Sequence, residues 1–289
     1  MTDEPGPAIR RRQLGRQLRD LRITAGFRTM EAAAEATGLS RVTIGRIESA
    51  KQTILPRTVR TLCHAYGVGA PMLDHLLRLA EESEDRGWLL EYSETVPNWF
   101  ARYAGEEADA STIWTYEPEC VPGLLQTDEY MRAVMAAARP GADPESLSDS
   151  IAFRRRRQER LTSDKPPQLM AVINQAALLR LVGGAAVMRA QLLHLIEMAS
   201  LPNVTLQALP FSAGAHPAMI CAFTVLHFPA EAGMATIYEE VYGGAVYPDT
   251  PAEIDHCRWM FGKLQELALS PEDTTGLLTT LAAELNPGE

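Results

Sequence analysis

The sequence predicts an α+β protein, in which an all-helical N-terminal domain of five helices precedes a mixed α/β domain with a small sheet. Up to residue 82, apolar side chains recur at helical spacing between Gly and Pro residues. Beyond that point, apolar or alternating segments predict strands at residues 168–173, 204–209, 223–228 and 235–240. The charge also changes sign, because residues 8–70 hold twelve Lys and Arg against four Asp and Glu, whereas residues 83–289 hold fourteen against twenty-eight.

The length of 289 residues allows two domains, which we place at residues 1–82 and 112–289 with a helical connector at residues 83–111. The 46% apolar and 22% charged fractions are those of an ordinary soluble protein. No apolar run reaches the length of a membrane span, the first residues lack the layout of a secretion signal, and the four cysteines lie far apart. We therefore expect a cytoplasmic protein with free thiols, whose basic N-terminal region contacts nucleic acid.

Proline and glycine mark the helix ends of the N-terminal domain. Pro7 is a favourable first helical residue and Gly26 ends that helix, while Pro56 and Gly67 delimit the fourth helix and Pro71 begins the fifth. The apolar side chains at helical spacing that we expect in the core are Leu14, Leu18, Leu21, Ala25, Val59, Leu62, Cys63, Tyr66, Leu73, Leu76, Leu77 and Ala80.

Residues 29–48 predict a helix-turn-helix, two short helices joined by a tight turn. Gly38 can take the left-handed conformation that ends the first helix, and Ser40 can cap the second. Ile44 and Ile47 then face inward, so the other side of the second helix is free to enter a DNA major groove.

Side chains suited to base edges and phosphates surround this second helix, which we call the reading helix. The predicted DNA-binding residues are Thr29, Ser40, Arg41, Val42, Thr43, Arg46, Lys51, Gln52 and Arg57. One such helix covers too few base pairs for specificity, so we expect a homodimer on a palindromic double-stranded operator. The apolar C-terminal domain is the expected place of dimer contact.

Five short helices with the reading pair at second and third resemble the Xre/phage-repressor helix-turn-helix family. The residues that match its motif are Thr29, Ala34, Gly38, Leu39, Ser40, Ile44, Ile47 and Glu48. The resemblance implies that Glu48 pairs with Arg22 or Arg19 of the first helix and holds the reading helix in place. Met30 stands where the family usually has Gln. Gly45 costs about 1 kcal/mol of helix propensity against Ala, and we expect it to allow close approach of a neighbouring helix or of DNA.

The C-terminal region begins with an aromatic segment from Trp88 to Tyr103, which we expect to pack on the domain that follows because acidic residues surround it. Residues 116–130 combine prolines and a glycine in a tight corner, and Thr127 or Asp128 can cap the next helix. For the four arginines at residues 154–157, intramolecular ion pairing is preferred over DNA contact. Further helices are expected at residues 188–199, 251–268 and 271–285.

Five motifs in this region form a recognisable set. They are Tyr116–Thr127, Arg157–Gln158, Met188–Leu195, Leu209–Pro217 and Ala268–Glu272. They resemble the C-terminal domain of unknown function that many Xre regulators of filamentous actinobacteria carry, and the resemblance extends over nearly all of residues 85–285. It implies a small partner protein encoded nearby, and some such pairs are antitoxin-like.

Motifs of common enzyme classes are missing from the sequence. It has no Gly-x-Ser-x-Gly turn, no Gly-x-x-x-x-Gly-Lys loop and no His-Glu-x-x-His pair, and its six histidines share no ligand spacing. We therefore expect no enzymatic activity, no metal and no cofactor. Ser212 with His216 is the best nucleophile and base pair, but a surface turn or a pocket lip explains it equally well. The residues predicted to border one ligand or partner cleft are Tyr116, Gln126, Tyr130, Ser212 and His216.

The sequence leaves three functions open. The leading one is a sequence-specific transcriptional regulator whose C-terminal domain binds a small protein or a ligand. The second is an antitoxin-like protein that neutralises its neighbour and uses DNA binding for autoregulation. A DNA-tethered enzyme is the third.

Overall fold

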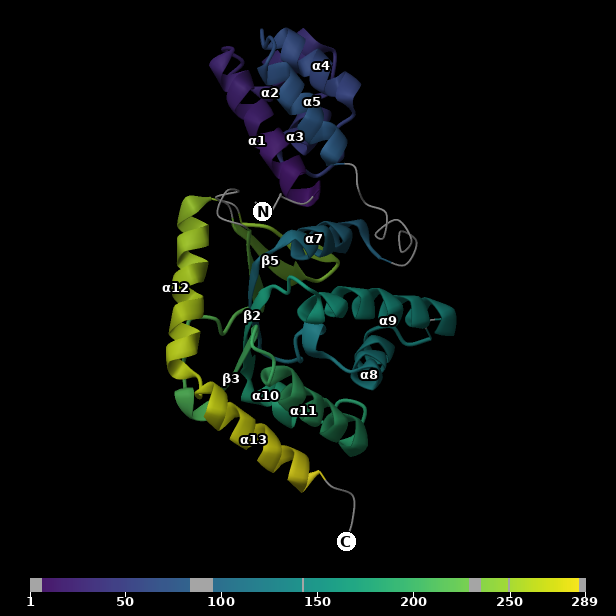
Figure 1. Ribbon diagram of the computed structural model, residues 1–289, viewed down its shortest axis with the longest axis vertical. Coiled ribbons are helices and arrows are strands. Elements are labelled where there is room, and N and C mark those ends of the chain that lie inside the picture. The colour runs from purple at the N-terminus through teal and green to yellow at the C-terminus, as the bar shows by residue number, and fades with distance from the viewer. Residues whose placement is uncertain (1–6, 84–95, 142, 229–234, 249, 286–289) are drawn as a thin grey trace. The chain divides into compact units, whose positions relative to one another are not determined.

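The computed structural model describes residues 7–83, 96–141, 143–228, 235–248 and 250–285. Contacts divide the chain into two compact units (Figure 1). The N-terminal unit within residues 1–91 is helical, and the C-terminal unit, which begins at residue 92, is mixed α/β and contains the strands. The predicted fold class is confirmed.

The N-terminal unit has the five predicted helices. They are α1 (Pro7–Thr24), α2 (Met30–Thr37), α3 (Arg41–Glu48), α4 (Pro56–Ala65) and α5 (Met72–Glu82). The local signals explain their ends: Gly26, Gly38 and Gly67 have φ angles of 90°, 71° and 71°. Glycine takes this left-handed conformation without the strain that a Cβ atom causes.

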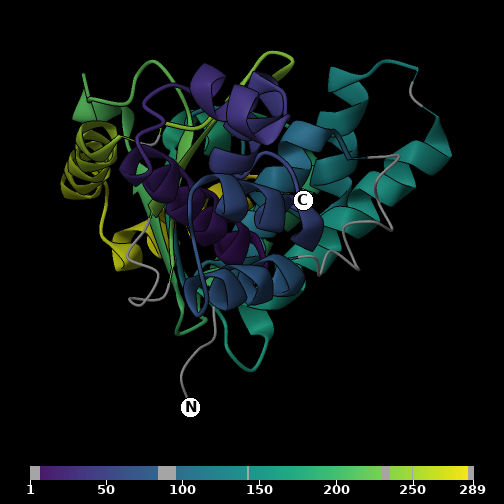
Figure 2. The same cartoon turned by 90° about the horizontal axis from the view of Figure 1, so that it is seen from above.

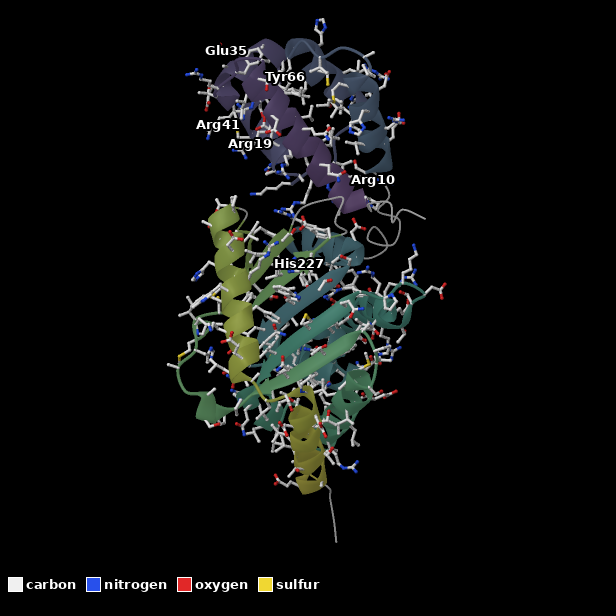
Figure 3. The ribbon with its side chains drawn as sticks, turned by 60° about the vertical axis from the view of Figure 1, so that its left-hand side comes forward. Arg10, Arg19, Glu35, Arg41, Tyr66 and His227 are labelled. Carbon is white, nitrogen blue, oxygen red and sulfur yellow. The ribbon has the colours of Figure 1, made fainter. Side chains whose placement is uncertain are left out.

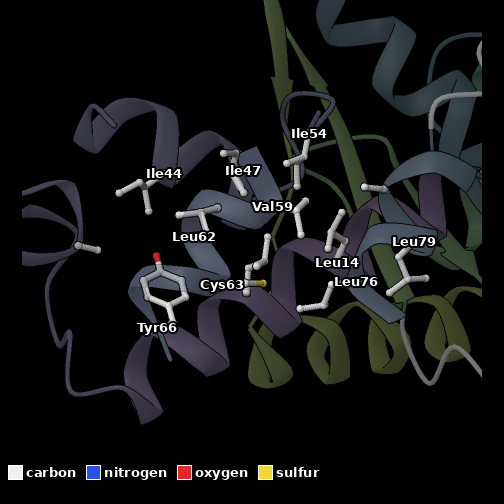
Figure 4. Close-up of a cluster of buried hydrophobic side chains, with 13 residues drawn as sticks. Leu14, Ile44, Ile47, Ile54, Val59, Leu62, Cys63, Tyr66, Leu76 and Leu79 are labelled. Atoms are coloured by element: carbon white, nitrogen blue, oxygen red, sulfur yellow. The ribbon is translucent and has the colours of Figure 1, made fainter. Parts of the chain in front are cut away.

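All five helices contribute to one core in the N-terminal unit (Figure 4). The predicted inward side chains of α3 and α4 are at most 1% exposed, apart from Tyr66 at 7%, and they are Ile44, Ile47, Val59, Leu62, Cys63 and Tyr66. Leu14 and Leu18 pack against them from α1. Ala25 is an exception among the predicted core residues, because α1 ends at Thr24 and Ala25 is exposed.

The C-terminal unit alternates strands with helices in its first part and ends in two helices. Its strands are β1 (Thr112–Glu117), β2 (Gln168–Asn174), β3 (Val204–Leu209), β4 (Phe223–His227), β5 (Ala235–Val241) and β6 (Gly244–Val246). Its α-helices are α7 (Asn98–Asp109), α8 (Asp128–Ala138), α9 (Pro144–Gln158), α10 (Gln175–Leu179), α11 (Ala185–Ala199), α12 (Pro251–Leu267) and α13 (Pro271–Glu284). Short 3-10 turns are η1 (Gly123–Leu125), η2 (Glu159–Thr162) and η3 (Phe211–Ala213).

The six strands form one mixed sheet in the order β3-β2-β1-β4-β5-β6. β1 pairs in parallel with β2, and β2 with β3, so helical crossovers connect these three strands. β4 runs antiparallel to β1, and β5 antiparallel to β4. The sequence predicted β2 to β5 but missed β1, the strand between the parallel and antiparallel halves, and β6.

Helices cover both faces of this sheet. Helix α12 lies on one face, where the Trp114 ring stacks on Phe261 with 5.1 Å between centroids. Helices α7, α8 and α9 lie on the other face, where Tyr103 of α7 stacks on Tyr238 of β5 at 4.1 Å. Figure 1 and Figure 2 both show α12 on the opposite side of the strands from α8 and α9. Side chains that alternate along each strand therefore enter two separate environments.

Part of the predicted connector belongs to the C-terminal unit. Within residues 83–111, the structure has helix α7 after Pro97, and its Phe100 and Tyr103 rings pack against Phe153 and Tyr238. The aromatic residues of this helix thus take part in domain packing, as expected from the sequence. Trp88 and Tyr92 lie outside the described residues.

Candidate nucleic-acid interface and the pocket of the C-terminal unit

Helices α2 and α3 are joined by the tight turn of a helix-turn-helix. The Gly38 amide donates to the Ala34 carbonyl oxygen at 2.9 Å and ends α2. Ser40 then caps α3, because its Oγ atom accepts from the Thr43 amide at 3.0 Å. These contacts fix the direction in which α3 leaves the turn.

Helix α3 has one buried and one exposed side. Ile44 and Ile47 are fully buried, whereas Arg41, Val42 and Arg46 are exposed. An isoleucine face that anchors the helix and a polar face open to solvent are what a helix in the DNA major groove requires. Figure 3 shows Arg41 pointing outward and Tyr66 inside the helical unit.

A buried ion pair holds the end of α3 against α1. The Glu48 carboxylate accepts from Arg22 Nε at 2.6 Å and from Nη2 at 2.9 Å, and both side chains are 4% exposed. Arg22 Nη1 also donates to the Phe27 carbonyl oxygen at 2.6 Å. The hydrogen bond to Glu48 raises the pKa of Arg22, so this guanidinium stays charged. The pairing implied by the family resemblance is confirmed, with Arg22 rather than Arg19 as the partner.

Two glycines allow the helices to pack closely. A Cβ atom on Gly45 would lie 3.3 Å from the Met30 sulfur, so the methionine at the position where the family has Gln packs over the glycine. Of the two expectations for Gly45, close approach of a neighbouring helix is the one that the structure supports. Gly15, for which no role was predicted, brings α1 still closer to α3, because a Cβ atom there would lie 2.6 Å from the Ile47 carbonyl oxygen.

The predicted phosphate contacts lie at the ends of helices. Thr29 caps α2, Arg57 is exposed in the first turn of α4, and Lys51 is exposed just after α3. Lys51 and Ala50 close α3 with amide hydrogen bonds to the Arg46 and Ile47 carbonyl oxygens at 2.8 and 3.0 Å. This double closure is a Schellman motif, and it directs the loop that holds Lys51 and Gln52.

Two side chains of the reading helix already have partners within the unit. The hydroxyl groups of Thr43 and Ser40 are hydrogen-bonded at 2.8 Å, so the capping residue Ser40 orients the Thr43 side chain. Arg41 forms a 2.9 Å ion pair with Glu31, but both side chains are more than 60% exposed. An exposed pair of this kind contributes little stability, and Arg41 can leave Glu31 for DNA at small cost.

Three glutamines hold the corner that follows β1, and two of them, Gln126 and Gln191, are buried. Gln126 Nε2 donates to the Val121 carbonyl oxygen at 2.6 Å, and Gln158 of α9 donates to the Gln126 carbonyl oxygen at 2.8 Å. Gln191 of α11 donates to the Leu125 carbonyl oxygen and accepts from the Thr127 amide, both at 2.7 Å. Three motifs quoted for the family resemblance thus meet here, and backbone groups of an irregular segment are satisfied internally.

The five residues predicted to border one cleft fall into two groups in the structure. Tyr116 lies on the α12 face, and its hydroxyl is 3.4 Å from His216 Nε2. Gln126 and Tyr130 lie on the other side of the sheet, and both bond to the backbone of Val121. Ser212 is exposed in η3, on the same loop as His216. Because side chains alternate along β1, Tyr116 and its neighbours Thr115 and Glu117 face opposite ways.

A cavity of about 330 Å³ opens on the face of the sheet away from α12. It lies beside the carboxyl end of β1, where open α/β sheets commonly bind ligands. Thr115, Glu117, Gln126, Arg154 and Glu240 are among its lining residues. A second cavity of about 240 Å³ adjoins it between α7, α8 and α9. This pocket could not be predicted from the sequence, because three of these five residues belong to β1 or β5, and the face on which their side chains lie depends on the pairing of the strands.

The arginine run of α9 pairs within the C-terminal unit. Arg155 and Arg156 form ion pairs with Asp128 and Glu159. Arg157 makes two 2.7 Å hydrogen bonds to Glu107, and Arg154 donates to Gln126. The predicted intramolecular ion pairing is thus present for three of the four arginines, Arg155, Arg156 and Arg157.

No group of three metal-binding side chains occurs among the described residues. Within the same residues, none of the helices has the length and apolar character needed to cross a bilayer.

Comparison with protein families agrees with this geometry. A model described as a helix-turn-helix domain matches residues 13–76, a range that begins within α1, includes α2 to α4 and ends within α5. The N-terminal unit is therefore a helix-turn-helix DNA-binding domain. The model "Domain of unknown function (DUF5753)" matches residues 100–280, more than half of the chain, and the chain belongs to this family. Neither a curated protein nor a solved structure matched the chain.

Proposed function

We propose that this protein is a cytoplasmic, sequence-specific transcriptional regulator of the Xre type. In this proposal its C-terminal unit binds a ligand or a small partner protein encoded nearby and thereby tunes DNA binding. The observation that carries the proposal is the two-sided α3 helix. Ile44, Ile47 and Glu48 anchor it in the N-terminal unit, while Arg41, Val42 and Arg46 remain exposed.

The exposed side chains match the chemistry of base edges in the major groove. Arg41 and Arg46 can each donate two hydrogen bonds to guanine, and the methyl groups of Val42 and Thr43 suit the thymine methyl group. Lys51 and Arg57 lie at helix ends that can approach phosphates, which set register rather than sequence. We infer that two copies bind a palindromic operator, with half-sites about 34 Å apart.

We assign the C-terminal unit a binding role rather than a catalytic one. The best nucleophile and base pair in the sequence was Ser212 with His216. One ring nitrogen of His216 faces the Tyr116 hydroxyl, and within the described part of the chain the buried Nδ1 atom has no hydrogen-bond partner. Neither nitrogen is therefore hydrogen-bonded to Ser212, as activation of a serine hydroxyl requires.

The proposal is tested by mapping DNA fragments bound by the purified protein across its source genome, and then by comparing variants on the best fragment. Arg46→Ala should lose about 1–3 kcal/mol of binding free energy and relax specificity at one position of each half-site. Arg78→Ala, an exposed arginine on α5, is the matched control and should bind as the parent does. Unchanged affinity and selectivity of Arg46→Ala would show that α3 is not the reading helix.

A further inference from the structure

We propose that the cavity beside the carboxyl end of β1 binds a small amphipathic amine. Its ammonium group would lie between the carboxyl groups of Glu117 and Glu240, and its apolar body would enter the adjoining cavity between α7, α8 and α9. This inference deepens the proposed function and rests on it only for the regulatory consequence of binding.

The cavity has the position and size of a small-molecule site. It lies wholly within the C-terminal unit, and its volume of about 330 Å³ is within the range of small-molecule sites. Across the floor, the hydroxyls of Thr115 and Thr224 bond each other at 3.1 Å. At one wall, the Tyr238 hydroxyl donates to Glu240 at 3.1 Å, so this carboxylate is held in place.

The charges around the cavity are unbalanced. Glu117 makes no hydrogen bond or ion pair among the residues that the structure describes, although it lines the cavity. Burial raises the pKa of Glu117 to about 8, and the charge of Glu240 adds to this rise, while Arg154 opposes it. A cationic ligand stabilises the ionised form of such a buried carboxyl group, because its positive charge supplies the partner that the protein does not provide.

The arginines at the cavity do not supply that partner. The Arg157 guanidinium is bonded twice to Glu107 and lies 4.9 Å above the Phe100 ring. Arg154 donates to the Gln126 side chain, and burial lowers the pKa of Arg154 to about 10. Arg157 is thus paired with Glu107, and the guanidinium of Arg154 is left as the single positive charge for two carboxyl groups, Glu117 and Glu240. One additional positive charge balances the site.

The adjoining cavity of about 240 Å³ offers space for the apolar part of the ligand. The residues that line both cavities are Phe100, Val134, Arg154, Arg157 and Glu240. Beyond this shared boundary the second cavity is mainly apolar, with Trp99, Met135, Leu147 and Phe153 among its lining residues. A ligand with a cationic head and a hydrocarbon body fits both chambers at once.

The affinity of this site for an amine should depend on pH. Burial raises the pKa of Cys120, and it raises that of Tyr130 to about 12, so both neighbours of Glu117 remain neutral while Glu117 ionises. The other groups that face Glu117 are Glu240 and Tyr238 of β5 and Arg154 and Arg157 of α9. An alkylammonium ion keeps its charge to about pH 10, so its binding should strengthen as Glu117 loses its proton.

The experiment uses the full-length protein and three probes of equal chain length: n-hexylammonium, n-hexanol and n-hexanoate. Isothermal titration at about pH 6 and about pH 8.5 should show saturable binding of n-hexylammonium, with a dissociation constant on the order of 1 mM or lower at the higher pH. The amine should bind at least about tenfold more tightly at the higher pH, and about tenfold more tightly than the alcohol. The carboxylate should bind weakest.

Two variants separate the site from general effects on the fold. Glu117→Gln keeps the shape of the side chain and should weaken n-hexylammonium at least about tenfold at the higher pH. Glu239→Gln removes the adjacent carboxylate on β5, which faces the α12 side, and should bind the amine as the parent does. Far-UV circular dichroism and unfolding curves verify that both variants are folded.

Three results would overturn the proposal: no saturable binding of the amine to folded protein at the higher pH, equal binding of the alcohol, or unchanged amine binding by Glu117→Gln. The operator affinity is measured on the same samples with and without the amine. Amine binding by a protein that does not bind DNA would leave the site intact and refute the proposed function instead.

Discussion

Alanine substitutions at Gly15 and Gly45 should change the stability of the N-terminal unit in opposite directions. Both glycines lie inside helices, and helix propensity alone predicts that each alanine stabilises its helix by about 1 kcal/mol. The surroundings differ. A Cβ atom at Gly15 would lie 2.6 Å from the Ile47 carbonyl oxygen and 3.1 Å from that of Glu48, both backbone atoms. At Gly45 the nearest atom is the Met30 sulfur at 3.3 Å, on a flexible side chain.

These distances determine how much each alanine substitution should change the stability of the N-terminal unit. Gly15→Ala forces α1 away from the end of α3, and overpacking of this kind costs about 1–3 kcal/mol, which exceeds or cancels the propensity gain. The same shift strains the Arg22–Glu48 ion pair at the end of α3, so we expect a net loss of about 1–2 kcal/mol. At Gly45→Ala the thioether of Met30 can move by a few tenths of an ångström. The propensity gain should then remain at about 0.5–1 kcal/mol.

Hydrogen–deuterium exchange with mass spectrometry can measure the local stability of the N-terminal unit in the full-length protein. It resolves the peptides of α1 to α5, which is necessary because all four tryptophans (Trp88, Trp99, Trp114 and Trp259) lie outside residues 7–83. Protection of these peptides should fall in Gly15→Ala and rise in Gly45→Ala, while peptides of the C-terminal unit serve as an internal control. If both alanines raised protection equally, the close packing of α1 on α3 would be refuted.

Three further predictions concern the buried charges and the DNA-binding surface. Glu48→Ala leaves the Arg22 guanidinium buried without its carboxylate partner. It should lower the free energy of unfolding of the N-terminal unit, measured by hydrogen exchange, by about 3–5 kcal/mol. A loss below about 1 kcal/mol would contradict the role assigned to this ion pair. Operator affinity should fall with salt with a log–log slope of about −4 to −7, since a dimer that makes about four to eight phosphate contacts releases that many counterions. A flat salt response would exclude DNA contact by the basic surface. Because folding raises the pKa of Glu117 from 4.5 to about 8, this carboxyl group stabilises the protonated fold below pH 4.5, and that contribution is lost as the pH rises to 8. Full burial would make the loss about 5 kcal/mol, but Glu117 is only partly buried and solvent screens its charge. The stability of Glu117→Gln should therefore rise by about 2 kcal/mol relative to the parent between pH 5 and pH 8. Urea unfolding followed by the fluorescence of Trp99, Trp114 and Trp259 reports this difference, and an equal gain at both pH values would disprove it.

The helix-turn-helix could be predicted because its signals are local. The glycine at Gly38, the serine cap at Ser40 and the isoleucines three residues apart at Ile44 and Ile47 all lie within ten consecutive residues. The change of charge between the two regions is likewise a property of composition. The family resemblance narrowed the partner of Glu48 to two arginines.

The sheet of the C-terminal unit was predicted less completely. Residues 112–117 were read as the approach to a corner, although they form β1, which pairs with both β2 and β4. A strand whose two neighbours come from residues 168–174 and 223–227 owes its stability to partners that are distant in the sequence. The residues predicted to border one cleft lie on two faces of the sheet for the same reason. The face on which each β1 side chain lies depends on how β1 pairs with β2 and β4.

By itself, the sequence determined the five helices, the two-sided reading helix and the charge asymmetry, since these depend on residues within a few positions of one another. The tertiary structure alone decided that Arg22 rather than Arg19 meets Glu48, that Gly15 lies against a backbone carbonyl group, and that Glu117 and Glu240 line one cavity. In each of these cases, the role of the residue depends on atoms that are distant in the sequence. Packing of helices and pairing of strands bring those atoms within a few ångströms.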